Sequence, residues 1–409
     1  MHLVPVNIES IRLAHPLPFP LMDKDGILIA KRGYIIPTRG DLVEYAQRNG
    51  GLFINVADSE AHHKAYVERL QNMVRDDKAL GEIAKTKLSL SRDAERFGAP
   101  PERLDWLDLQ FQANALAQEV QPEYFAERLQ RLSSQLQRHC RETPDGTLFA
   151  LMYLTASEPR MYSATHGMLV AAMCNLAAHE VLKWPDNEVD LLFKAALTMN
   201  LGMAQLQDQL AVQKDPPSLA QRKVIDSHAE RSVALLQARG VGSLDWLEVV
   251  RHHHQQVPGP LAARTLAGRM TRLLQRADMF SAKMSPRLSR QPVAPSVAMQ
   301  ASYYDEERKV DEAGAALIKA VGVYPPGTFV KLTTEEIAVV VRRGSTTTMP
   351  KAAVLLNRTG MPTVEHTIRD TSLRDYKVAS SVAFRVVRVR LNLQRMLPLT
   401  LGAPSDKPW

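Results

Sequence analysis

The spacing of hydrophobic positions divides the 409-residue chain into three parts. Residues 1–56 contain short apolar runs, LPFPLMD, ILIAKRGYII and GLFINV, which are separated by the turn sequences DKDG and RNGG. Short runs bounded by Gly, Asn and Asp are typical of β-hairpins. The pattern therefore predicts a small β domain over residues 1–56.

Helical periodicity begins near Glu60 and dominates to about Val321. We assign residues 57–145 to a helical connector and residues 146–322 to a helical domain that is interrupted at DPPS and RLSRQPVAPS. Within that domain, ALTMNLGMAQLQ is predicted to be a well-formed helical stretch. In the connector, apolar side chains at intervals of three and four share one helix face: Phe125, Leu129, Leu132, Leu136 and Cys140.

The last change comes at GVYPPGTFVKLTTEEIAVVVRR, where β-branched residues return. This pattern predicts a C-terminal β element over residues 323–396, followed by a tail at 397–409. The expected fold class is therefore mainly α, with a helical domain flanked by a small N-terminal β domain and a C-terminal β element.

Composition narrows the class of protein. The content of 45% apolar and 23% charged residues is ordinary for a globular chain. The longest weakly polar run, MLVAAMCNLAA, is far shorter than the roughly 20 residues of a membrane span, and MHLVPVNIES lacks the features of a signal peptide. Cys140 and Cys174 lie among apolar neighbours and are expected to be buried thiols. We therefore expect a cytoplasmic protein.

The net charge of +7 is concentrated near the C-terminus. Residues 342–395 hold eleven Lys or Arg and three acidic residues, a local excess of eight positive charges. Such a face can meet phosphates or an acidic partner. No interleaved aromatic residues or zinc-knuckle spacing accompany it, so a solvated strand face is the preferred interpretation, and nucleic-acid binding is kept as an alternative.

The candidate chemistry lies in the helical domain. Its possible ligands are spread over what the pattern predicts to be four helices: His166, His228, His253, His254 and Asp278. Adjacent histidines serve one metal poorly inside a helix, but Pro258 and Gly259 predict a helix end just after the pair. His252 is expected to be exposed. Asp278 has an alternative role in capping, or in an ion pair with Arg276 or Lys283.

In their order, these residues resemble the HD-GYP branch of the HD-domain phosphohydrolases, helical proteins that hydrolyse cyclic di-GMP. The landmarks of that family are a His, an HDxGK stretch, a further His, an HHE followed by GYP, and an Asp near ADxFDA. The resemblance covers about residues 148–322 and extends into YPPGTFVKL. It implies a helical HD-type domain in which the four histidines and Asp278 occupy positions of metal ligands.

The chain differs from the family at the positions of the catalytic motif. Met199 and Asn200 stand in place of the HD pair, and Met203 stands in place of the Lys. Gln255 replaces the Glu of HHE, and Tyr162 stands where members with a third metal have a Glu. A binuclear hydrolase needs a bridging carboxylate, which an amide replaces poorly. The sequence therefore singles out no catalytic residue.

The resemblance implies that one metal position is left with only His166 and Asp278. The other keeps His228, His253 and His254, which suits at most one divalent ion such as Fe, Mn or Zn. Our first hypothesis is a catalytically weak or inactive HD-GYP-type module that binds cyclic di-GMP or a protein signalling partner. The alternatives are a metal-dependent cyclic di-GMP phosphodiesterase with a rearranged site, and nucleic-acid binding by the basic C-terminal strands.

Overall fold

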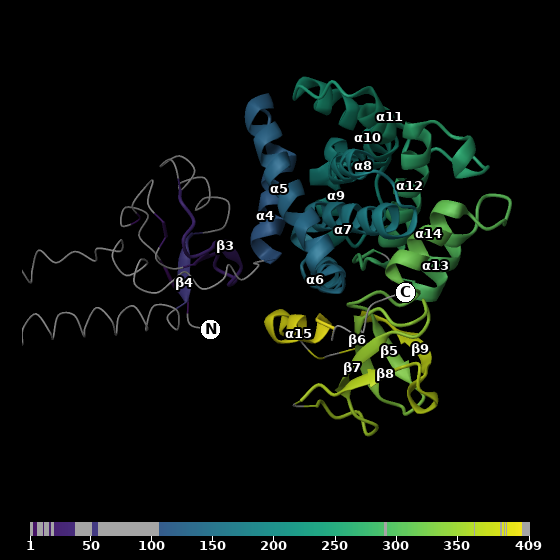
Figure 1. The fold of residues 1–409 in the computed structure, drawn as a ribbon. Helices are drawn as coiled ribbons and strands as arrows, with labels where there is room; N and C mark the ends of the chain where they lie inside the picture. The colour runs from purple at the N-terminus through teal and green to yellow at the C-terminus, as the bar shows by residue number, and fades with distance from the viewer. Residues whose placement is uncertain are drawn as a thin grey trace, which may run out of the picture. The chain divides into compact units, whose positions relative to one another are not determined.

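The structure of the chain is a computed structural model. The structure describes residues 3–5, 11, 16–17, 20–36, 51–55, 106–289, 293–363, 365–384, 387, 389 and 391–402. The chain forms two compact units, Met1–Phe111 and Gln112–Trp409. The fold is mainly α, with a small sheet near the N-terminus and another near the C-terminus, as the sequence predicts (Figure 1).

The first unit contains a small antiparallel sheet with strand order β1-β4-β2-β3. Its strands are β1 (Leu3–Pro5), β2 (Leu21–Met22), β3 (Leu28–Ala30) and β4 (Phe53–Asn55). The DKDG sequence forms the turn between β2 and β3, where the N–H of Asp23 donates to the carbonyl of Ile27 at 2.8 Å. Leu21, Ile36 and Leu52 form part of the core. The RNGG turn and most of the expected connector lie outside the described residues.

The second unit is built around one buried helix, α7 (Tyr162–Leu176), whose residues from Thr165 to Leu176 are all buried. A helix that is apolar all round requires neighbours on every side, and α7 contacts α5, α6, α8, α9, α12 and α14. The surrounding helices are α5 (Pro122–Glu142), α6 (Pro144–Ser157), α8 (Asp186–Thr198), α9 (Ala204–Val212), α10 (Leu219–Ala238), α11 (Leu244–His252), α12 (Leu266–Met284), α13 (Pro295–Tyr303) and α14 (Glu312–Val321). Helix α4 (Trp106–Gln118) runs across the boundary between the two units.

Helix α5 carries its buried residues where the sequence places them. Pro122 occupies the first turn, where its missing N–H costs nothing. All five predicted apolar positions are buried, together with Ser133. This apolar face packs against α6, α7 and α8.

The stretch ALTMNLGMAQLQ does not form one helix, so this prediction is wrong. Helix α8 ends at Thr198, a 3₁₀ turn covers Leu201–Met203, and α9 begins at Ala204. The cause is a close approach to α10, because a Cβ at Gly202 would lie 2.5 Å from the carbonyl oxygen of His228. The N–H of Gly202 donates to Ser232 Oγ at 2.8 Å and fixes this approach.

The C-terminal part of the second unit is an antiparallel sheet with strand order β8-β7-β6-β5-β9. Its strands are β5 (Phe329–Leu332), β6 (Ile337–Arg342), β7 (Lys351–Leu356), β8 (Ile368–Asp370) and β9 (Val378–Val382). One face, with Phe329 and Val339, packs on Phe149 of α6 and on α15 (Leu393–Thr400), which lies beside the sheet in Figure 1. The finer division of the chain at residues 56, 145, 322 and 396 stays a prediction.

Among the described residues, no helix is both long enough and apolar enough to span a membrane. Both cysteines are buried thiols, as the sequence predicts. Burial raises the pKa of Cys140 to about 12, so this thiol is held in its neutral, unreactive form.

Candidate metal centre

Four helices supply the candidate ligands. His166 lies on α7, His228 on α10 and Asp278 on α12. Helix α11 ends at His252, so His253 caps the helix and His254 follows it. The predicted helix end is therefore present, and it allows the two adjacent histidines to face the same point.

His228, His253 and His254 form a cluster in which one ring nitrogen of each residue lies within 4.8 Å of those of the other two. The Nε2 atoms of His228 and His253 are 3.2 Å apart, and those of His228 and His254 are also 3.2 Å apart. Within the part of the chain that the structure describes, this is the one grouping of three or more His, Cys, Asp or Glu side chains with metal-ligand spacing. We call it the three-histidine cluster.

The ring tautomers follow from the contacts of the opposite nitrogens. His228 Nδ1 donates to the carbonyl of Ile225 at 2.5 Å, and His253 Nδ1 donates to the carbonyl of Val250 at 2.6 Å. A neutral imidazole carries one proton, so both Nε2 atoms present lone pairs toward the centre of the cluster. Carbonyl acceptors of this kind orient metal-binding histidines in proteins.

Burial keeps these imidazoles neutral. Desolvation, together with the neighbouring His254, lowers the pKa of His253 to about 3. Burial likewise lowers the pKa of His228. Neutral imidazole is the form that binds a metal ion, so His228 and His253 do not have to lose a proton near pH 7.

The cluster fits a small divalent ion. In a tetrahedral site with Zn–N distances of about 2.0–2.1 Å, neighbouring nitrogens are about 3.3 Å apart. The two separations of 3.2 Å match that spacing. His253 is buried whereas His254 is exposed, so one side of the cluster is open to solvent. These residues can hold one ion and leave a position for an outside ligand.

His166 and Asp278 form a separate pair. His166 Nε2 lies 2.8 Å from Asp278 Oδ1, and His166 Nδ1 lies 3.0 Å from Ser281 Oγ. Burial acts to raise the pKa of Asp278, but the hydrogen bond and charge of His166 outweigh it and hold the pKa below its usual value. Both ring nitrogens of His166 are thus engaged by α12.

Other side chains cover the ring of His166. Tyr162 is fully buried and its ring stacks on that of His166, with the ring centroids 5.5 Å apart. Arg287 donates to the Tyr162 hydroxyl at 3.2 Å and lies over its ring. The alternative pairing of Asp278 with Arg276 is wrong, because Arg276 donates to the carbonyl of Tyr304 and to Glu306.

The residues that stand at the family's catalytic positions differ in their burial and contacts. Met199 is fully buried at the end of α8. Asn200 is buried, its Oδ1 has no hydrogen-bond partner among the residues that the structure describes, and the residue lines a cavity of about 20 Å³, large enough for one water molecule. Met203 ends the 3₁₀ turn, and Gln255 has an exposed side chain. His252 is half-buried rather than exposed, which corrects the prediction.

Sequence reasoning missed two polar residues on α12. Arg272 and Gln275 are buried, and Gln275 Nε2 donates to the carbonyl of Gln255, directly after the histidine pair. The signal was present in LAGRMTRLLQRADMF, where Arg272, Gln275 and Asp278 recur every three residues among apolar residues such as Leu273, Leu274 and Ala277. Polar side chains on a buried helix face require partners.

Several cations of the C-terminal segment have partners within the chain. Arg369 pairs with Glu336 at 2.8 Å, and Lys351 lies 3.8 Å from Asp370. Arg343 is buried and bonds Asp145 and Glu180. These side chains are therefore engaged in holding the sheet and its neighbours together.

No protein-family model matches the chain, and a comparison with curated proteins finds no match. Among solved structures, the chain is similar to an HDG"Y"P protein from Bdellovibrio bacteriovorus. The identity is 14%, the TM-score is 0.43, and the match covers 77% of this chain and 98% of that chain. The match is loose, so the resemblance to the HD-GYP branch rests on the residues of this chain.

Proposed function

We propose that the chain is an HD-GYP-type signalling module that holds one divalent metal on the three-histidine cluster and is catalytically weak or inactive. The observation that carries this proposal is the convergence of three Nε2 atoms, 3.2 Å apart in two of the pairs, without a carboxylate in the cluster. His228, His253 and His254 would hold the ion. Fe, Mn and Zn all accept imidazole ligands.

Two features support weak or absent hydrolysis. The carboxylate of Asp278 is hydrogen-bonded to His166, and the position of the missing HD aspartate is held by the neutral Asn200. A bridging carboxylate is what offsets the charge of two neighbouring ions and lets a shared water ionise. Met203 supplies no cation to a reacting phosphate, which removes a further source of stabilisation.

The ligand that we propose for this module is cyclic di-GMP, on the basis of the family resemblance in residues 148–322. The chemistry is consistent with it, because a metal ion that is open on the side of His254 can accept a phosphate oxygen as an outside ligand. Binding would then change the contacts of the loop after His254, a suitable signal for a protein partner.

A second candidate is a mononuclear phosphodiesterase. It is favoured by the exposure of His254 beside the buried His253, since three protein ligands and one open position define catalytic zinc sites. Such an ion supplies Lewis acidity to a phosphate oxygen when bound. The loss of both the bridge and the Lys is expected to lower the rate by several orders of magnitude.

The test has two arms. Purified protein is analysed for metal after incubation with Fe²⁺, Mn²⁺ or Zn²⁺, and it is then incubated anaerobically with cyclic di-GMP while pGpG and GMP are followed by chromatography. We expect about one equivalent of metal and no product above that of the His253→Ala/His254→Ala variant. Turnover that disappears in this variant would establish the phosphodiesterase instead. Protein that retains no metal would remove the proposed metal centre.

A further inference from the structure

The loop that follows the histidine pair, residues 255–261, is held by side chains from three directions. Gln275 Nε2 donates to the carbonyl of Gln255 at 2.7 Å. The N–H of Leu261 donates to Glu312 Oε2 at 2.8 Å, and Arg264 donates to the carbonyl of Gly259 at 3.0 Å. The contact made by Gln275 lies one residue after His254 and so acts directly on the metal-binding end of the loop.

The orientation of Gln275 is fixed by Arg272. Arg272 Nη1 donates to Gln275 Oε1 at 2.9 Å. An amide that accepts a hydrogen bond through its oxygen from an arginine presents its NH₂ group elsewhere, and here that group meets the carbonyl of Gln255. A flipped amide would place NH₂ against the guanidinium and lose both contacts.

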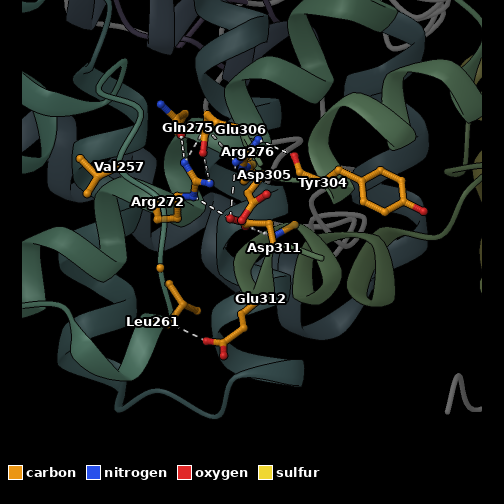
Figure 2. A network of polar contacts seen from close by, with 12 residues as sticks. Val257, Leu261, Arg272, Gln275, Arg276, Tyr304, Asp305, Glu306, Asp311 and Glu312 are labelled. Atoms are coloured by element: carbon orange, nitrogen blue, oxygen red, sulfur yellow. Dashed lines mark hydrogen bonds and ion pairs between the residues drawn. The ribbon is translucent and has the colours of Figure 1, made fainter. Parts of the chain in front are cut away.

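Arg272 is itself immobilised by carboxylates. It is 2% exposed, its Nε donates to Asp311 Oδ2 at 2.7 Å, and its terminal nitrogens donate to both oxygens of Glu306 at 3.0 and 2.9 Å. In Figure 2, dashed lines join Arg272 to Gln275, to Glu306 and to Asp311. A guanidinium held by several charge-assisted bonds has little freedom to move.

A second arginine completes the charge balance of this network. Arg276 Nη2 lies 3.2 Å from Glu306 and 3.4 Å from Asp311, and its Nη1 donates to the carbonyl of Tyr304 at 3.2 Å (Figure 2). Two buried guanidinium groups therefore face the buried carboxylate of Asp311 and the more exposed carboxylate of Glu306. The network needs no outside ion for neutrality, so its polar side chains are free to serve a positional role.

Helix α12 thus contacts both groups of candidate ligands. Gln275 and Asp278 are three residues apart and lie on the same helix face. Asp278 engages His166, while Gln275 holds the chain that leaves His254. His253 is fixed by burial and by its contact with the Val250 carbonyl, whereas His254 is exposed.

We propose that Gln275 is a positioning residue of the metal centre: its amide, aligned by Arg272, holds Gln255 and thereby keeps His254 directed at His228 and His253. This inference rests on the proposed metal-binding function. It assigns this arginine–carboxylate network a role in ligand geometry in addition to its role in packing α12.

The variant that tests it is Gln275→Glu. The new side chain has the same size and still accepts from Arg272, but it cannot donate to the carbonyl of Gln255. The matched control is Gln130→Glu on the exposed face of α5, where the amide donates to Ser134 Oγ at 3.1 Å. This control makes the same chemical change far from the network.

Co²⁺ is the probe, because its visible absorption spectrum reports the geometry of its ligands. We expect Gln275→Glu to weaken Co²⁺ binding by about 10- to 100-fold and to alter the spectrum, while the metal-free protein stays folded at a lower thermal stability because a carboxylate then faces the Gln255 carbonyl. In metal-free protein, the amides of residues 255–257, 259 and 261 should exchange hydrogen faster than in the wild type. Gln130→Glu should match the wild type in all of these measurements.

The outcomes separate the two proposals. If the wild type binds no Co²⁺, the metal centre is wrong and the role of Gln275 in it falls too, while hydrogen exchange still reports whether Gln275 holds the loop. If the wild type binds Co²⁺ and Gln275→Glu matches it in affinity and spectrum, the metal centre stands and the positioning role is overturned. A loss of thermal stability with an unchanged Co²⁺ spectrum would likewise overturn it, because it would leave Gln275 a purely structural residue.

Discussion

The two groups of candidate ligands differ in what their imidazoles face. His166 meets a carboxylate on one ring nitrogen and a hydroxyl on the other, so its hydrogen-bonding capacity is met by α12. In the three-histidine cluster, by contrast, lone pairs of His228 and His253 face each other at 3.2 Å. Facing lone pairs repel unless a proton or a cation lies between them. The same residue type therefore forms a closed structural pair in one place and a candidate cation site in the other.

The most direct test of this difference is to remove one histidine of the three-histidine cluster. His253→Ala should abolish the bound metal, with an affinity loss of at least about 100-fold, because two imidazoles hold a borderline metal poorly. Metal analysis after dialysis measures the effect. His139→Ala on α5 is the matched control, and equal metal content in the two variants would contradict the cluster as the binding site.

A second substitution disturbs the cluster through the backbone. Gly202→Ala would place a Cβ 2.5 Å from the carbonyl oxygen of His228 and 2.8 Å from the nitrogen of Ser232. Backbone atoms cannot yield as a flexible side chain does, so we expect a loss of about 2–4 kcal/mol in unfolding free energy and weaker metal binding. Denaturant unfolding and metal titration test this. Gly242→Ala, where a Cβ meets nothing within 4 Å, is the control.

A substitution in the pair of His166 and Asp278 should lower the stability of the protein without removing the metal. Asp278→Asn keeps an oxygen acceptor for His166 but removes the charge, and we expect a loss of about 2 kcal/mol in unfolding free energy. The metal content of the three-histidine cluster should change by less than 10-fold, because Asp278 is bonded to His166. Metal loss as complete as in His253→Ala would show that Asp278 is a ligand after all.

The smallest effect concerns the start of α7, the helix that carries His166. Asp208 accepts from the N–H of Ser163 at 2.7 Å, and burial raises its pKa to about 6. A carboxyl whose pKa is raised on folding stabilises the protein below its unfolded value of about 4, and this contribution is lost as pH rises through about 6.

Asp208→Asn keeps the acceptor and cannot ionise. Relative to the wild type it should therefore gain about 1 kcal/mol at pH 7.5, a figure reduced for solvent screening because the side chain is only partly buried. The gain should vanish near pH 4. Thermal unfolding across this pH range measures it, and a gain independent of pH would contradict the raised pKa of Asp208.

The sequence by itself determined the fold class and the order of its parts. Periodicity of three and four located the buried face of α5, and the proline and glycine after His254 located the end of α11. These features are local, because they depend on backbone preferences and on the spacing of apolar side chains along one element. The resemblance in residues 148–322 also brought together the five candidate ligands before any contact was known.

Only the tertiary structure decided how the ligands meet. The resemblance implied the division into a pair and a group of three histidines, but the direct bond of His166 to Asp278 and the 3.2 Å separations of the Nε2 atoms depend on distances between four helices, which no local pattern contains. Likewise, the break at Gly202 arises from α10, a separate helix about thirty residues away in sequence, and overrides a stretch whose composition favours a helix. The partners of Gln275 lie 20 residues before it and three residues before it, and only the first contact gives the amide a role beyond its own helix. Long-range packing decides which partner each polar side chain meets. It gives His166 a partner on both ring nitrogens, whereas in the three-histidine cluster it brings nitrogen atoms together as candidate metal ligands.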